Sequence, residues 1–237
     1  MRRLLLVLLL CLTACSGSAH PSRRTTVTVF AASSLTKAFA AEGKAFEHDH
    51  PGVRVSFSFA GSQSLVAQIK QGAPADVLAT ADEQTIASVR TQLVAAPVVF
   101  AHNQLAIITA HGNPLHLRSL RDLARPGLKV VLAGPTVPVG KAADKALSNA
   151  GVVLHPVSLE DSVSGVISKV RLGEADAGIA YVTDVRSSGA TLDGISLDGT
   201  RTNLAIGALD SSPDSLAFVA FVRSAQGQAI LRALGFG

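Results

Sequence analysis

Short apolar runs that alternate with helical patterns predict an α/β protein. The runs are rich in β-branched residues, as expected for buried strands, and they lie at residues 25–31, 53–59, 76–80, 128–133 and 176–182. Between the runs, apolar residues recur every three or four positions, as at Val163, Val166, Ile167 and Val170. That spacing places them on one face of a helix. The alternation of strand and helix predicts largely parallel sheet flanked by helices.

Two further β-type stretches, at residues 98–109 and 203–209, divide the pattern into two α/β units. We interpret them as paired crossover strands, which would form a hinge between two lobes. The expected lobe 1 comprises residues 25–101 and 205–237, and the expected lobe 2 comprises residues 102–204. A single larger α/β domain is the alternative that the pattern leaves open.

The first residues have the pattern of a targeting signal. Two arginines precede an apolar run over residues 4–12, which is short for a membrane-spanning helix. The run ends in Leu-Thr-Ala-Cys at residues 12–15, which resembles a bacterial lipobox, where cleavage before the cysteine leaves that cysteine lipidated. We therefore expect a signal peptide at residues 1–14, a lipid such as palmitate on Cys15, and a polar tether that ends at residue 24. A lipid anchor of this kind would hold the protein on the outer face of the cell membrane. An ordinary signal peptide with an incidental cysteine is the alternative.

Composition argues against several other kinds of protein. The net charge is only +4 and aromatic residues make up 4% of the 237 residues, so a nucleic-acid partner is not expected. Both cysteines, Cys11 and Cys15, precede the folded body, which excludes a disulfide framework or a thiol catalyst there. We interpret the His-Asp-His sequence at residues 48–50 as a solvated helix end rather than a metal site. No metal or cofactor is therefore expected.

Turns rich in small and hydroxyl residues separate strand from helix at four places, residues 30–35, 59–65, 134–140 and 160–164. A helix start leaves free backbone N–H groups and a partial positive charge. Such starts line the crevice at the carboxyl ends of parallel strands, where ligands bind. The pattern predicts an anion site that needs no lysine or arginine. The alternative is that the serines of the first two turns, Ser34 and Ser62, only cap their helices.

Lys141 stands in the first turn of the helix that follows the third of these turns. It could attract an anion from a distance, but we favour the interpretation that it is plain surface charge.

Three segments together resemble the molybdate-binding receptors of ABC importers. They read VFAASSL at residues 29–35, FAGSQSL at 59–65 and QIKQGAPADV at 68–77, and the resemblance continues at residues 137–143 and 178–181. It covers nearly the whole chain after the tether. The resemblance implies the two-lobed type II periplasmic-binding-protein fold, with capture of molybdate, no enzymatic activity, and delivery to an ABC permease. Tungstate has the same charge and nearly the same shape, so we expect it to bind as well. We also expect a monomer.

The resemblance also implies which residues bind the anion. The family's oxyanion is held by the second serine of the first turn, here Ser34, and by the serine of the second turn, here Ser62. The family's two backbone N–H donors correspond to Val139 and Val163 of this chain. Its tyrosine hydroxyl donor corresponds to Tyr181, which is the chain's single tyrosine.

This chain departs from the family pattern at three positions. Val139 stands where alanine is expected, Gly61 where serine is expected, and Ser162 where the family often has Asp or Asn. The first change is compatible with a backbone contact, although valine narrows the pocket.

The chemistry of the ligand agrees with a site made of donors. Molybdate is a fully ionised dianion without a proton, whereas protonated phosphate would need an acceptor. A receptor for another oxyanion such as sulfate, or for a small carboxylate, is the alternative. An α/β lipoprotein hydrolase is disfavoured, because neither Ser34 nor Ser62 lies in a G-x-S-x-G motif.

Overall fold

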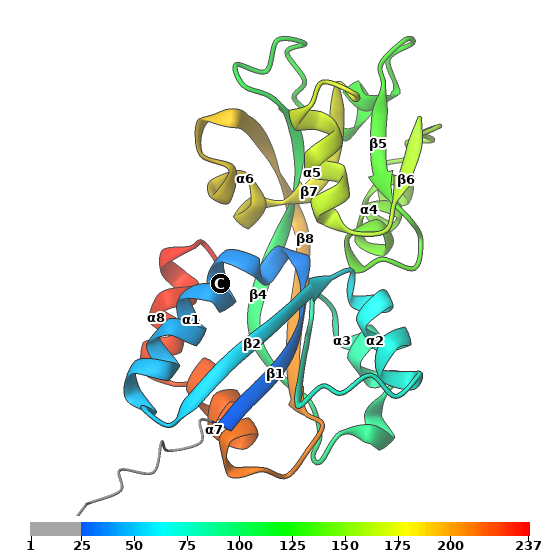
Figure 1. Ribbon diagram of the computed structural model, residues 1–237. Coiled ribbons are helices and arrows are strands. Elements are labelled where there is room, and N and C mark those ends of the chain that lie inside the picture. The colour runs from blue at the N-terminus through cyan, green and yellow to red at the C-terminus, as the bar shows by residue number, and fades with distance from the viewer. Residues whose placement is uncertain (1–24) are drawn as a thin grey trace, which may run out of the picture.

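The computed structural model describes residues 25–237, which form one mixed sheet flanked by helices. The sheet has eight strands in the order β2-β1-β3-β8-β4-β7-β5-β6. Figure 1 shows two groups of elements, one above the other, joined by the long strands β4 and β8. The predicted α/β class is confirmed. The predicted signal peptide, the lipidated Cys15 and the tether lie outside the described residues.

We call the two groups lobe 1 and lobe 2. Lobe 1, the lower group in Figure 1, contains β1 (Thr25–Ala32), α1 (Thr36–Asp49), β2 (Val53–Ala60), α2 (Ser62–Lys70), β3 (Val77–Thr80), α3 (Glu83–Ala87), α7 (Pro213–Val222) and α8 (Ala225–Ala233). Lobe 2 contains β5 (Val130–Ala133), α4 (Pro138–Asn149), β6 (Ser158–Glu160), α5 (Val163–Arg171), β7 (Ala177–Tyr181) and α6 (Val182–Ser188). The connecting strands are β4 (Val98–Ala110) and β8 (Leu192–Ala208).

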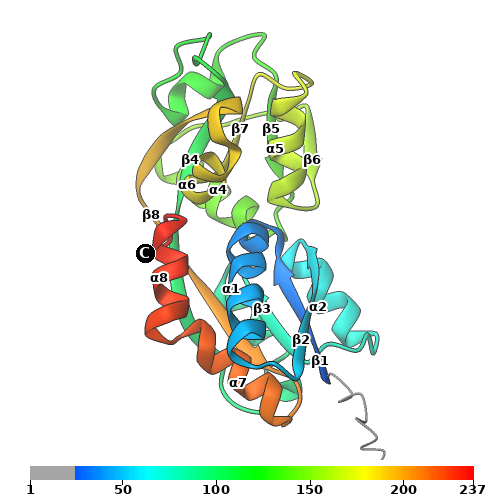
Figure 2. The ribbon, with the colours of Figure 1, turned by 60° about the vertical axis from the view of Figure 1, so that its left-hand side comes forward.

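Each lobe is built around parallel strands, as the alternation predicts. In lobe 1, β1 is parallel to both β2 and β3. In lobe 2, β5 is parallel to both β6 and β7. The antiparallel pairs all involve the connecting strands: β8 is antiparallel to β3 of lobe 1, β4 is antiparallel to β7 of lobe 2, and β4 and β8 are antiparallel to each other. The view in Figure 2 shows these two strands side by side between the lobes. The exact residues at which each lobe begins and ends stay a prediction.

An aromatic cluster fixes α1 in lobe 1. The ring of Phe39 lies 6.2 Å from Phe57 on β2, 5.8 Å from Phe100 on β4 and 6.1 Å from Phe218 on α7. Buried aromatic pairs at such distances contribute about 0.5–1.5 kcal/mol each beyond their burial. The cluster therefore holds α1, and with it the short 3₁₀ turn Ser33–Leu35 that precedes it, in one position.

Two elements differ from the sequence prediction. The last long strand begins at Leu192, well before the expected residue 203. The sequence pattern missed its first part because the polar residues over 198–203, none of them buried, interrupt the apolar run. The helix that follows Asp82 ends at Ala87 instead of continuing to Arg90. Asp82 caps that helix as predicted, since its side chain accepts a hydrogen bond from the N–H of Thr85 at 2.6 Å.

Across residues 25–237, no helix combines the length and the apolar character that crossing a membrane requires.

Candidate ligand-binding site

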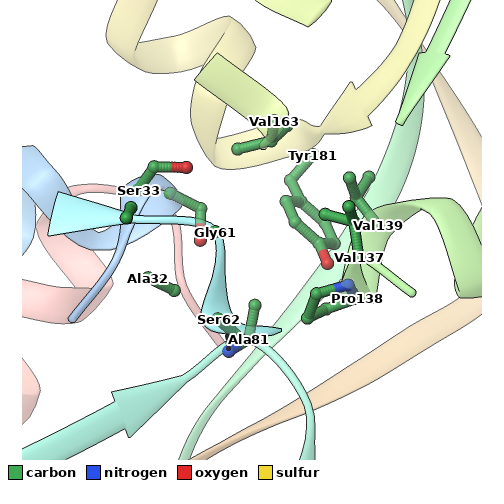
Figure 3. Close-up of a pocket in the computed structure, with 12 residues that line it drawn as sticks. Ala32, Ser33, Gly61, Ser62, Ala81, Val137, Pro138, Val139, Val163 and Tyr181 are labelled. Atoms are coloured by element: carbon green, nitrogen blue, oxygen red, sulfur yellow. Dashed lines mark hydrogen bonds between the residues drawn. The ribbon is translucent and has the colours of Figure 1, made fainter. Parts of the chain in front are cut away.

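A small pocket lies between the lobes, where all four predicted turns meet (Figure 3). Its walls are Ala32, Ser33, Ser34, Ala60, Gly61, Ser62, Ala81, Val137, Pro138, Val139, Val163 and Tyr181. The cavity measures about 10 Å³. Space of that order holds one water-sized sphere, whereas pockets for drug-sized ligands measure some hundreds of Å³. The pocket therefore suits a compact ion and not a sugar or a peptide.

The structure brings all five residues predicted for the site, Ser34, Ser62, Val139, Val163 and Tyr181, to this one pocket. Four of them follow the carboxyl end of a strand, and Tyr181 is the last residue of β7. Parallel strands end at the same edge of a sheet, which is where ligands bind in such folds. Their role as ligand donors stays a prediction.

Ser34 and Ser62 do not cap helices, contrary to the alternative considered for them. The caps are Ala32 for the 3₁₀ turn and Gly61 for α2, and neither helix start has a side-chain cap. The hydroxyl of Ser34 is buried and has no hydrogen-bond partner among the described residues. The hydroxyl oxygen of Ser62 accepts a bond from the N–H of Ala81 at 3.1 Å, which leaves its own O–H free to donate.

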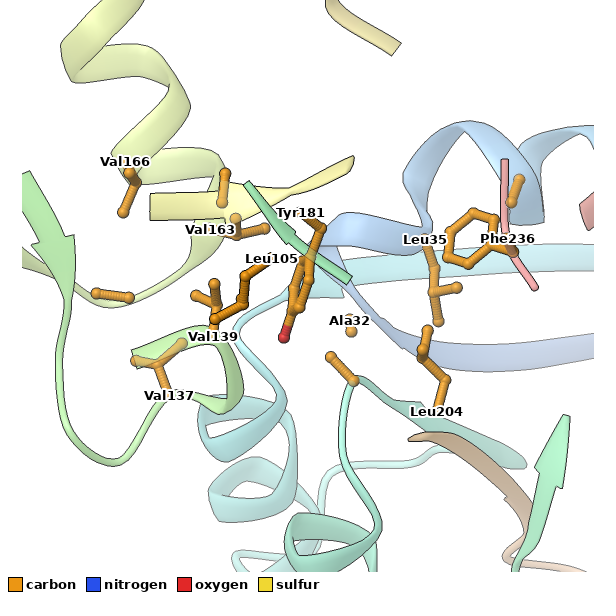
Figure 4. Packing of buried hydrophobic residues seen from close by; sticks show 14 of the residues in the cluster. Ala32, Leu35, Leu105, Val137, Val139, Val163, Val166, Tyr181, Leu204 and Phe236 are labelled. Atoms are coloured by element: carbon orange, nitrogen blue, oxygen red, sulfur yellow. The ribbon is translucent and has the colours of Figure 1, made fainter. Parts of the chain in front are cut away.

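Tyr181 presents a hydroxyl that nothing in the described part of the protein satisfies. Its side chain is 1% exposed, and Figure 4 shows the ring beside Leu105, Val139 and Val163. Burial raises the pKa of the Tyr181 hydroxyl well above its usual value, and the nearby carboxyl of Asp184 raises it further. The hydroxyl therefore stays protonated and can only offer a hydrogen bond to an anion.

The two predicted backbone donors lie at helix starts in lobe 2. Val139 is the second residue of α4 and Val163 is the first residue of α5. The first N–H groups of a helix have no acceptor within that helix. At α5, Ser162 caps the helix by accepting from the N–H of Gly165 at 3.3 Å, which leaves the N–H of Val163 available to the pocket.

The pocket contains donors but no ionised side chain among its walls. Most buried polar atoms in folded proteins have a partner, so two unsatisfied hydroxyls in one pocket, those of Ser34 and Tyr181, indicate a missing acceptor. An anion with several oxygen atoms would supply it, because neutral hydroxyl and N–H donors can surround such an ion. Within residues 25–237, no cluster of three or more His, Cys, Asp or Glu side chains is placed to hold a metal ion.

Three side chains make polar contacts between the lobes. The ammonium group of Lys141 on α4 lies 3.2 Å from the Asp82 carboxylate of lobe 1. The Gln63 amide of lobe 1 donates to the Asp161 carbonyl of lobe 2 at 2.6 Å, and Lys37 donates to the carbonyl of Ser187. Lys141 is therefore an interlobe partner rather than plain surface charge, so our preferred interpretation of this residue is wrong. The error has a physical cause, since Asp82 lies 59 positions away in sequence.

The approach of the Asp161 carbonyl to lobe 1 also explains why glycine stands at position 61. A Cβ atom at this position would lie 2.2 Å from the Asp161 carbonyl oxygen, a backbone atom of the opposite lobe. A side chain at this position would therefore require the Asp161 backbone, or the contact between the lobes, to shift. The sequence showed only that Gly61 replaces an expected serine, and the reason needs the structure.

These features together define a class of protein, a two-lobed binding protein with its ligand site between the lobes. The family model for bacterial extracellular solute-binding proteins matches residues 27–237, and the chain belongs to that family. It is a binding protein of the extracytoplasmic space and not an enzyme.

The relatives support the same assignment. The chain is 43% identical over 218 residues to the molybdate-binding protein ModA of Mycobacterium tuberculosis, covering 89% of this chain and 84% of that protein. Its structure resembles the periplasmic molybdate-binding protein of Azotobacter vinelandii, with a TM-score of 0.79, 20% identity, and coverage of 89% and 98% of the two chains. It also resembles the sulfate-binding protein SubI of Mycobacterium tuberculosis, with a TM-score of 0.79, 19% identity, and coverage of 90% and 86%. The two structural matches establish the periplasmic-binding-protein fold.

Proposed function

We propose that this protein captures molybdate outside the cytoplasmic membrane and delivers it to an ABC permease. The observation that carries the proposal is the pair of buried hydroxyls, Ser34 and Tyr181, that face one compact pocket without a partner. The 43% identity to a protein named for molybdate binding supports the choice of ligand.

The donor set suits a fully ionised oxyanion. The hydroxyls of Ser34, Ser62 and Tyr181, with the N–H groups of Val139 and Val163, would surround the ion with donors. A phosphate that keeps a proton would need an acceptor, and no carboxylate is among the walls. Tungstate offers the same charge and nearly the same shape, so we propose that it binds in the same way.

Capture would depend on the lobes moving about β4 and β8. When the lobes part, the donors of lobe 1 separate from those of lobe 2 and water can reach both sets. When the lobes close, each hydrogen bond to the ion forms in a dry environment where electrostatic attraction is stronger. The closed, liganded form would then be the form that the permease recognises.

A titration series tests the ligand. We expect molybdate and tungstate to bind the purified protein in isothermal titration calorimetry and to raise its melting temperature, because a ligand that binds only the folded state stabilises it. Sulfate and phosphate serve as matched competitors of the same tetrahedral shape. A response to sulfate or phosphate, with none to molybdate or tungstate, would refute the assignment and favour a receptor for a different oxyanion.

We also propose that Cys15 carries the lipid that holds the protein at the outer face of the membrane. The support is the Leu-Thr-Ala-Cys sequence after the apolar run at the N-terminus. The Cys15→Ser variant should leave the membrane fraction, and mass spectrometry of the wild-type protein should find acyl chains on the peptide that begins at Cys15. Membrane association that survives the substitution would contradict the proposal. We propose a monomer with no further cofactor, and size-exclusion chromatography with light scattering tests the monomer.

A further inference from the structure

An ion pair crosses between the lobes immediately beside the pocket. Lys141 lies two residues after the wall residue Val139, and Asp82 directly follows the wall residue Ala81. The Lys141 ammonium lies 3.2 Å from the Asp82 carboxylate and 3.1 Å from the Thr85 hydroxyl. The two partners stand on α4 of lobe 2 and before α3 of lobe 1, so the pair forms only when the lobes meet.

The pair is partly shielded from water. The side chains of Lys141 and Asp82 are 31% and 20% exposed, which places them between a free surface pair and a buried one. One oxygen of Asp82 accepts the N–H of Thr85 as the cap of α3, and the other faces Lys141. The carboxylate is thus fixed in place whether or not Lys141 is present.

Asp82 is placed where it would disfavour an anion. Asp82 directly follows the wall residue Ala81, and its negative charge adds to the effects of burial and Asp184 in raising the pKa of the Tyr181 hydroxyl. A dianion in the pocket would be repelled by the same carboxylate. The ammonium of Lys141 offsets that repulsion, but only in the closed arrangement.

We propose that Lys141 is a positioning residue that holds the lobes closed over the bound anion by neutralising Asp82, without touching the anion itself. The proposal rests on the proposed function, because it concerns the same pocket. It predicts that Lys141 acts through Asp82, that it slows release of the anion, and that its effect weakens as salt rises, because salt screens partly exposed charges.

A double-mutant cycle on the full protein tests the proposal. The variants are Lys141→Met, Asp82→Asn and the combination of both, where asparagine keeps the helix cap. Lys145→Met is the control, since Lys145 is exposed on the same helix and has the same charge. Each protein is titrated with the oxyanion that binds the wild type, and release is followed by stopped-flow fluorescence of the single tyrosine, in a chain without tryptophan.

We expect Lys141→Met to weaken binding about fivefold, equivalent to about 1 kcal/mol, mainly by faster release. In the Asp82→Asn background the same substitution should cost less than about twofold, because the charge to be neutralised is gone. The control Lys145→Met should leave affinity unchanged. Melting temperatures without anion should agree among all variants, which separates the effect from a folding defect.

Three results would overturn the proposal. An equal loss from Lys141→Met with and without Asp82 would mean that the lysine attracts the anion directly. An unchanged affinity in Lys141→Met, or an equal loss in Lys145→Met, would remove the specific role of the ion pair. If the wild type binds none of molybdate, tungstate, sulfate and phosphate, the proposed function fails first and this inference fails with it.

Discussion

Replacing Tyr181 with phenylalanine tests the site with a change of one atom. The ring would keep its packing, since the side chain is 1% exposed and its hydroxyl has no partner among the described residues. No hydrogen bond within the described part of the protein would therefore be lost. The substitution removes only what the hydroxyl gives to a ligand.

The size of the effect follows from that geometry. A hydrogen bond to a charged group contributes about 1.5–3 kcal/mol, which corresponds to about a 10- to 150-fold loss of affinity. The stability of the unliganded protein should be unchanged or slightly higher, because the hydroxyl makes no bond within the described residues that the substitution could break. Tyr181→Phe should thus bind molybdate more weakly while unfolding at an equal or higher denaturant concentration.

Isothermal titration calorimetry measures the affinity, and urea unfolding without anion measures the stability. Thr183→Val is a matched control, because the Thr183 hydroxyl is also buried but accepts a bond from the Asn103 amide at 2.7 Å. The control should lose stability and keep its affinity. If Tyr181→Phe binds molybdate within twofold of the wild type, the hydroxyl is not a ligand and the assignment of Tyr181 is refuted.

Three further predictions concern the pocket, the contact between the lobes and the core. Ser34→Ala and Ser62→Ala should each weaken molybdate binding about tenfold or more in calorimetry, but only Ser62→Ala should also lower the melting temperature, since it leaves a buried backbone N–H without its acceptor. Gly61→Ala should weaken binding by at least tenfold, because its Cβ would collide with the Asp161 carbonyl and keep the lobes apart, and small-angle scattering with molybdate should show a less compact protein than the wild type. Glu42 is fully buried, and burial raises its pKa from 4.5 to about 8. Between these two values the folded state holds a proton that the unfolded state has lost. The free energy of unfolding should therefore fall as pH rises from about 4.5 to about 8. Glu42→Gln should reduce that dependence in urea unfolding at the two ends of the range, and the buried carboxyl of Asp184, whose pKa burial raises to about 7, should account for part of what remains.

Each of these predictions has an outcome that contradicts it. Unchanged affinity in both serine variants would remove the mapped site. A Gly61→Ala protein that closes and binds like the wild type would show that the lobes adjust to the added atom. Stability that stays level between the two pH values in the wild type would mean that the Glu42 carboxyl is solvated in the folded protein.

The sequence by itself determined the class of the fold and predicted which turns would meet at one pocket. Strand and helix have different hydrophobic periods, so the alternation of β1, α1, β2 and the later units could be recognised from local pattern alone. The turn serines Ser34 and Ser62 stood at the junctions of those elements, and parallel strands bring such junctions to one edge. Resemblance to a family then assigned Val139, Val163 and Tyr181, which no local pattern could have selected.

Only the tertiary structure decided which partners each of these groups has. The sequence could not distinguish a cap from a free donor at Ser34, because that depends on whether the hydroxyl meets the N–H groups of its own helix or an empty pocket. Nor could it pair Lys141 with Asp82, since a contact across 59 positions depends on how the lobes close. Local pattern follows from the backbone geometry of neighbouring residues, whereas these contacts follow from the packing of distant ones. That is why the meeting of the four turns was predictable from the sequence and the ion pair between Lys141 and Asp82 was not.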